Sequence, residues 1–214
     1  MDAAEEGGCN VSGGRVASAR AGGGFTLVEV LVVVVVVGVL LGIALPWLAG
    51  ARREGRVVAC MGNLRSLGMA VESHMDRSGG VLPLALATAS VRDGELAPFE
   101  EISAYLEAPL PRLSASGGVE TGPPYVCPSD RSYAVEHGFS YGYGPMDFMR
   151  ISYTADPARD VTAYFRRTGV SDPILLDVWG FHRRRGPIEG PNHGGPSGKN
   201  GWCMDGSVRR DVGH

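Results

Sequence analysis

The feature that most constrains the fold is an apolar segment near the N-terminus. Between Val30 and Leu48 the sequence contains no charged side chain. As an α-helix this segment would be about 28 Å long, enough to cross the hydrocarbon core of a bilayer. Its many valines favour strand in water, but in lipid the backbone must satisfy its own hydrogen bonds, which requires a helix. The segment therefore predicts one membrane-spanning helix.

Four residues give this segment a more specific character. Glu29 directly precedes it, where an unpaired carboxylate is costly, so we expect Glu29 to have a partner. Gly38 and Gly42 form G-x-x-x-G, a spacing that lets two membrane helices approach closely, although glycine is also simply tolerated in such helices. Pro46 lacks a backbone donor and predicts a bend near the far end.

The sequence around the start of this segment resembles a known processing site. Residues 24–29 read Gly-Phe-Thr-Leu-Val-Glu, and they resemble the cleavage site of type IV prepilins and type II secretion pseudopilins. The resemblance implies that a prepilin peptidase/methyltransferase cuts between Gly24 and Phe25 and methylates the new N-terminus at Phe25. It also makes Glu29 the fifth mature residue, one helical turn from the Phe25 ammonium. Glu29 would then neutralise that ammonium, in its own chain or a neighbour, and set the register of a helix bundle.

A secretory signal peptide cleaved near Ala51 is the alternative. Arg15 and Arg20 would form its basic region. However, the apolar segment is longer than the usual core of about 7 to 15 residues and begins beside the charge of Glu29. We therefore favour cleavage at Gly24.

The orientation of the chain in the membrane has two readings. Most of the nearby basic residues follow the apolar segment, so the positive-inside rule would place the C-terminal side in the cytoplasm. The resemblance implies the opposite, a single-pass inner-membrane protein with a cytoplasmic N-terminus and its head in the periplasm or on an extracellular filament. We follow the resemblance, because the leader is cut on the cytoplasmic face.

We expect four parts in the chain: a cleaved leader (1–24), a transmembrane helix (25–51), an amphipathic continuation of this spine helix (52–78) and a globular α+β head (79–214). The continuation has an apolar stripe at helical spacing, formed by Val57, Met61, Leu64, Gly68, Val71 and Met75. The fold class is α+β and pilin-like, with the long helix packed on a small antiparallel sheet.

The elements of the head are predicted from turn residues and short apolar runs. A short helix is expected at 98–106, loops at 109–124 and 186–201, and a hairpin with a two-residue Asp-Gly turn at 202–209. Strands are expected at 125–127, 139–143, 161–165 and 174–178.

Two further stretches, 60–68 and the CPSD segment 125–130, resemble a pilin-like group of planctomycete-type genomes. That group ends in a histidine, nine residues and Asp-Gly. The matching residues here are His193 and Asp205-Gly206, with a spacer two residues longer. The resemblance favours a disulfide between Cys60 and Cys127, with buried thiols as the alternative.

The remaining composition points away from other functions. The formal net charge is −3, or about −2 without the leader, which argues against nucleic acid as the main partner. The polar residues His182, His193, Cys203, Asp205 and His214 lack tight metal-ligand spacing, and G-x-S-x-G is absent. The sequence thus predicts no metal site, no cofactor and no enzyme activity.

These observations together favour a structural subunit of a type IV pilus or a type II secretion pseudopilus-like filament. Its partners would be the prepilin peptidase, other pilin or pseudopilin subunits, and the lipid bilayer. The alternative is a membrane-anchored or secreted envelope protein whose head binds or cleaves a ligand.

Overall fold

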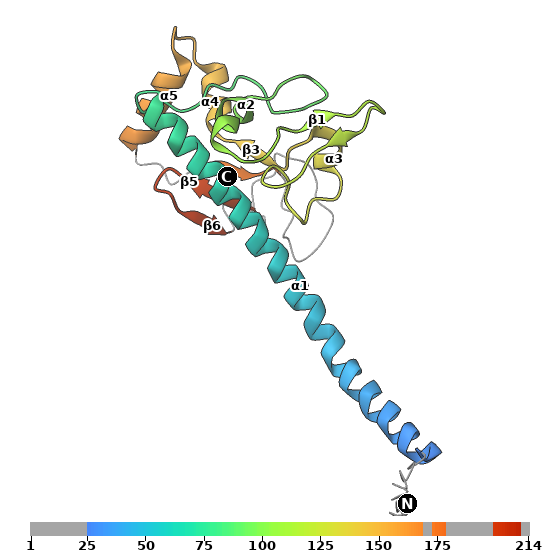
Figure 1. Cartoon of the computed structure of the whole chain (residues 1–214). Coiled ribbons are helices and arrows are strands. Elements are labelled where there is room, and N and C mark those ends of the chain that lie inside the picture. The colour runs from blue at the N-terminus through green and yellow to red at the C-terminus, as the bar shows by residue number, and fades with distance from the viewer. Residues whose placement is uncertain (1–24, 169–172, 179–198, 211–214) are drawn as a thin grey trace, which may run out of the picture. The chain divides into compact units, whose positions relative to one another are not determined.

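The computed structural model describes residues 25–168, 173–178 and 199–210. The chain divides into two compact units, Met1–Trp47 and Leu48–His214. One helix, α1 (Leu27–Arg77), contributes residues to both units (Figure 1).

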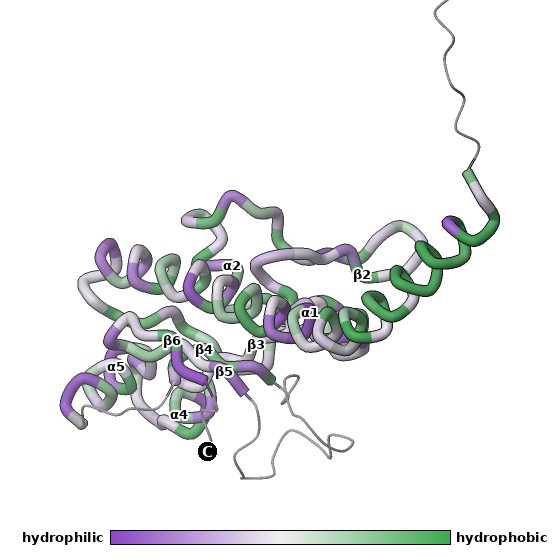
Figure 2. The backbone as a smooth tube through the Cα atoms, turned by 90° about the horizontal axis from the view of Figure 1, so that it is seen from below, coloured by the Kyte–Doolittle hydropathy of each residue, from purple (hydrophilic) through white to green (hydrophobic). Residues whose placement is uncertain are grey.

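In the first unit, the described residues are the start of α1 and the two residues before it. The large apolar side chains of this part are exposed, and Figure 2 shows the tube hydrophobic over most of its length. By length and composition α1 can cross a membrane, as the sequence predicted. The helix continues through Pro46; the bend expected there stays a prediction.

The second unit combines short helices with two antiparallel sheets, which confirms the α+β class. A four-stranded sheet has the order β3-β4-β5-β6, and β1 pairs with β2 in a separate ribbon. The strands are β1 (Arg112–Leu113), β2 (Val119–Glu120), β3 (Tyr141–Tyr143), β4 (Pro173–Asp177), β5 (Asn200–Cys203) and β6 (Val208–Arg210). The helices are α2 (Phe99–Ile102), the 3₁₀ turn η1 (Ser103–Tyr105), α3 (Tyr133–His137), α4 (Pro145–Ile151) and α5 (Pro157–Thr168).

The C-terminal half of α1 packs on the four-stranded sheet. Its buried face includes Val57, Leu64 and Val71, so the predicted apolar stripe is confirmed. The closest approach is at Gly68, where a Cβ atom would overlap the indole ring of Trp202 on β5. Glycine is thus required at this position because the tryptophan occupies the space of a side chain.

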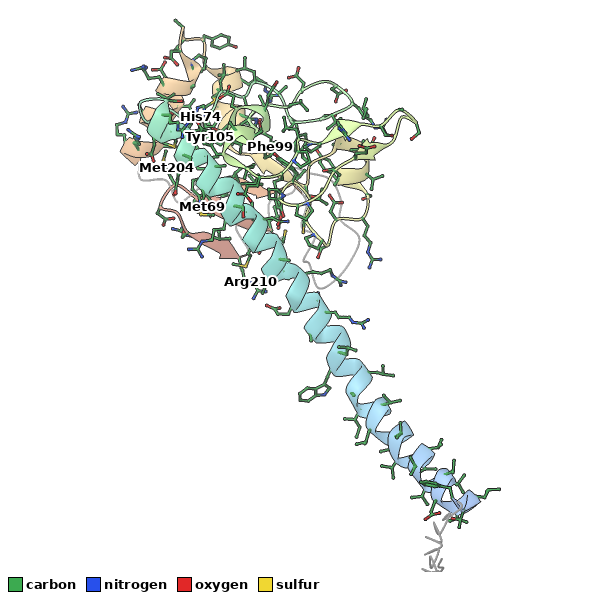
Figure 3. All side chains as sticks on the ribbon, in the orientation of Figure 1. Met69, His74, Phe99, Tyr105, Met204 and Arg210 are labelled. Atoms are coloured by element: carbon green, nitrogen blue, oxygen red, sulfur yellow. The ribbon has the colours of Figure 1, made fainter. Side chains whose placement is uncertain are left out.

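Further contacts join α1 to the rest of the second unit at both ends of the packed region. Arg210 on β6 forms an ion pair with Glu54 of α1, and Arg210 lies beside α1 in Figure 3. Near the end of α1, the guanidinium of Arg77 lies 5.2 Å from the ring centroid of Tyr105. His74 Nε2 lies 3.6 Å from Glu101 Oε2. The short helix predicted at 98–106 therefore forms, as α2 and η1, and packs on α1.

Several local predictions were wrong. Residues 161–165 lie in helix α5, because Val161 and Phe165 share one helical face and both are buried. The Asp156 carboxylate accepts a hydrogen bond from the Arg159 amide, a cap that marks the start of this helix. Residues 125–127 are irregular and form no strand, whereas the predicted loop 109–124 contains β1 and β2.

The predicted hairpin 202–209 forms, as β5 and β6, but with a longer turn. Cys203 and Ser207 are joined by a backbone hydrogen bond, so the loop has three residues, Met204 to Gly206. Gly206 has φ +77°, the left-handed conformation expected at the end of such a loop.

Substitution at Gly68 tests the packing of α1 on the sheet. We expect Gly68→Ala to destabilise the protein by about 1–3 kcal/mol, since the added methyl overpacks against Trp202. The control is Gly62→Ala on the same helix, where a Cβ meets nothing within 4 Å among the described residues. That change should stabilise by about 0.5–1 kcal/mol. Denaturant unfolding of the full chain in detergent measures both, and equal stabilisation by the two changes would contradict the packing.

Candidate processing and assembly site

The start of α1 is organised by a hydrogen-bonded pair, Thr26 and Glu29. The backbone N–H and the hydroxyl of Thr26 each donate to Glu29 Oε2 at 2.8 Å. In return, the Glu29 N–H donates to Thr26 Oγ1 at 3.2 Å. This is a capping box, which satisfies amides that a helix N-terminus otherwise leaves without partners.

The predicted cleavage site adjoins this cap. Phe25 precedes the helix and is 81% exposed. Gly24 lies outside the described residues. The expected partner of Glu29 was the ammonium of Phe25 in a cleaved chain. In the full-length chain Phe25 is not a terminus, and the Glu29 carboxylate accepts hydrogen bonds from Thr26. The role of Glu29 toward a cleaved neighbour stays a prediction.

The glycine pair lies on the exposed apolar part of α1. At Gly38 and at Gly42 a Cβ would meet nothing within 4 Å among the described residues. The valines and leucines around them are exposed as well. In water such a surface would be strongly unfavourable, so this part of the helix needs lipid or other apolar helices around it. The role of the pair in helix packing stays a prediction.

The comparisons with known proteins agree with this geometry. Residues 20–45 match a protein family described as the prokaryotic N-terminal methylation motif. The match supports a type IV pilin-like protein. It covers residues 20–24, the capping box and most of the apolar part of α1. No curated protein and no solved structure match. The motif is typical of structural subunits and implies processing by a prepilin peptidase.

The CPSD segment has a structural role at Asp130. Asp130 Oδ1 accepts hydrogen bonds from the amides of Ser132 and Tyr133 at 3.0 and 2.9 Å. Its Oδ2 accepts from the Ala134 amide at 2.9 Å and from the Ser140 hydroxyl at 2.6 Å. The carboxylate therefore caps α3 and ties it to the residue before β3.

The two stretches that resembled the pilin-like group contact each other. Asn63 Nδ2 on α1 donates to the Val126 carbonyl at 2.8 Å. Cys60 and Cys127 are both buried thiols, and a hydrogen bond joins their side chains. The hydrogen bond to Cys127 and burial raise the pKa of the Cys60 thiol. The structure thus brings the predicted cysteine pair together, while the disulfide itself stays a prediction.

An aspartate that the sequence analysis left out of its predicted sites completes this cluster. The Cys60 thiol donates to Asp177 Oδ1 at 3.1 Å, and Asp177 is fully buried at the end of β4. The hydroxyl of Tyr141 on β3 lies 3.2 Å from Cys60 Sγ. Cys60, Cys127 and Asp177 are far apart in the sequence, and no short spacing motif marks them. Only the pairing of β3 with β4 and the packing of α1 bring them together.

The C-terminal motif is described only in part. Asp205 accepts hydrogen bonds from the Ser207 hydroxyl and amide at 2.5 and 2.9 Å, and from Arg209 at 2.6 Å. The hydrogen bonds from Ser207, with a smaller contribution from Arg209, lower the pKa of Asp205 to about 2. His193 lies outside the described residues. Asp205 and Gly206 therefore shape the hairpin turn, and their predicted relation to His193 stays a prediction.

Substitution of Asp130 tests the structural role of the CPSD segment. We expect Asp130→Ala to cost about 1–3 kcal/mol of folding free energy, because it removes a helix cap and leaves its donors without a partner. The control is Asp147→Ala, which removes an exposed ion pair with Arg150 at 3.6 Å and should cost less than about 0.5 kcal/mol. Denaturant unfolding gives both values. Similar costs for the two variants would show that the Asp130 contacts do not support the fold.

Proposed function

We propose that this chain is a structural filament subunit, of a type IV pilus or a type II secretion pseudopilus. The observation that carries the proposal is the match to the methylation motif at 20–45, whose residues from Leu27 onward lie in the capped apolar helix α1. Prepilin peptidase would remove the leader after Gly24 and methylate Phe25. The further resemblance to the planctomycete-type group rests on the 60–68 and CPSD stretches and belongs to the same proposal.

The hydrogen bonds of the Glu29 carboxylate support this proposal. Both hydrogen bonds from Thr26 end on Oε2. Cleavage would create an ammonium at Phe25, and Oε1 is the oxygen that we assign to this cation, within the chain or from a neighbouring subunit. A charge pair buried among apolar helices is favourable only when both partners meet. Glu29 would therefore select one register in the helix bundle.

The exposed apolar part of α1 would lie first in lipid and then among the helices of other subunits. Before assembly its valines and leucines would face lipid in the inner membrane, with the N-terminus cytoplasmic and the head exported. In the filament the same side chains would pack against those of other subunits. Gly38 and Gly42 would allow close approach of the helices there. The α+β head would then lie on the outside of the bundle.

The first test is the N-terminal residue and intact mass of the protein from membranes of its native host. We expect a chain beginning at N-methylated Phe25, because this residue lies within the motif match at 20–45 and directly precedes the capping box that starts α1. A chain beginning near Arg52 would instead indicate a secretory signal peptide. An uncut Met1 would also overturn the proposal and would favour an anchored envelope protein.

The second test separates the charge of Glu29 from its capping role. Glutamine also serves in a capping box, so Glu29→Gln keeps the helix start but removes the charge. We expect incorporation into filaments to fall by about 100-fold or more, since breaking a buried pair costs about 3–5 kcal/mol.

The control for this test is Glu54→Gln, which removes an acid of α1 that pairs with Arg210 in the second unit. It should assemble normally. Filament recovery and membrane levels of each variant are compared by immunoblot. Normal assembly of Glu29→Gln would show that the glutamate acts only as a cap.

A further inference from the structure

We propose that Cys60, Cys127 and Asp177 bind a zinc ion. The proposal goes beyond filament assembly and does not depend on it. The three residues come from α1, the CPSD segment and β4, and each is fully buried. Their ligand atoms lie within 4.8 Å of one another.

The spacing of the three ligand atoms fits three of the four positions around a tetrahedral ion. With Zn–S and Zn–O distances of about 2.3 and 2.1 Å, two ligands on zinc lie about 3.5–3.8 Å apart. Cys60 Sγ and Asp177 Oδ1 are already 3.1 Å apart, so adjustments of about 1 Å or less would form the site. Two thiolates and a carboxylate suit zinc better than calcium or magnesium, which take oxygen ligands.

Groups around the three ligands would orient them. The Asn200 backbone N–H and Nδ2 both donate to Asp177 Oδ2, at 2.8 and 3.1 Å. This fixes the carboxylate with Oδ1 toward Cys60. The Tyr141 hydroxyl lies 3.2 Å from Cys60 Sγ and can donate to its thiolate. Such outer hydrogen bonds are a regular feature of protein zinc sites.

The charges also balance when an ion is included. Zinc binding releases the two thiol protons of Cys60 and Cys127 and leaves two thiolates beside the carboxylate of Asp177. Three negative charges then meet a divalent cation. Lys199 is close enough for the Asp177 carboxylate to act on its ammonium electrostatically. Its positive charge offsets the remaining negative charge, which a buried site otherwise bears at high cost.

A disulfide between the same cysteines fits the surroundings less well. Oxidation removes the thiol proton that Cys60 donates to Asp177 Oδ1. A buried carboxylate would then keep the bonds from Asn200 but lose this donor, which is unfavourable. A metal ion replaces the lost hydrogen bond with a coordinate bond. It would also fasten α1, the CPSD segment and β4 together at one point.

The test uses the full chain, purified in detergent with a thiol reductant and without chelators. We expect about one zinc per chain by elemental analysis, with loss of most zinc in Cys60→Ser and in Cys127→Ser and weaker binding in Asp177→Asn. Cys203→Ser is the control, because Cys203 is a buried thiol of β5 outside the cluster. This variant should keep its zinc.

Two further measurements keep the result clear if a variant does not fold. Wild-type protein stripped of metal and titrated with cobalt(II) should develop thiolate-to-cobalt absorption that saturates at about one equivalent. A chelator should lower the unfolding temperature of the zinc-loaded wild-type protein, since metal bound to the native state stabilises that state.

The intact mass and the thiol alkylation of non-reduced protein reveal the outcomes that would overturn the zinc proposal. A mass about 2 Da lower, with Cys60 and Cys127 protected from alkylation and no zinc bound, would establish the disulfide and overturn the proposal. Alkylatable thiols with no zinc or cobalt binding would overturn it too.

Discussion

The packing of the C-terminal half of α1 against the four-stranded sheet is the interaction on which the second unit depends. The strands are short, with three to five residues each, and a sheet of this size needs a covering element to bury its apolar face. The helix provides that cover through Val57, Leu64 and Val71. Trp202 fills the space that Gly68 leaves, so the helix and the sheet approach most closely where the helix has no side chain.

Much of the helical part could be predicted, because its signals are local and long. A charge-free segment, an apolar stripe at helical spacing and a processing motif all lie within one continuous stretch of sequence. The Thr26-x-x-Glu29 capping box also follows a known sequence spacing, although it was not predicted. The predicted pairing of Glu29 with a Phe25 ammonium concerns a cleaved chain, so it stays a prediction beside the Thr26 contacts of the full-length chain.

The head was harder to predict, because its short elements have weak local signals. A run such as 161–165 fits a strand or a helix equally well until its neighbours are known. The Asp156 cap was the local signal that would have decided in favour of the helix. No short spacing motif in the sequence marks the cluster of Cys60, Cys127 and Asp177. It arises from the register Tyr141 to Asp177 between β3 and β4, and from the face that α1 presents to them.

The capped start of α1 also decides whether loss of a leader would disturb the helix. The helix begins at Leu27, and a backbone-to-backbone hydrogen bond at its start runs from the Val30 amide to the Thr26 carbonyl. None of the capping interactions uses an atom that precedes Thr26. Loss of a leader ending at Gly24 would therefore leave these bonds in place. Precursor and mature protein would share one and the same helix, and maturation would alter its charge without any need to refold it.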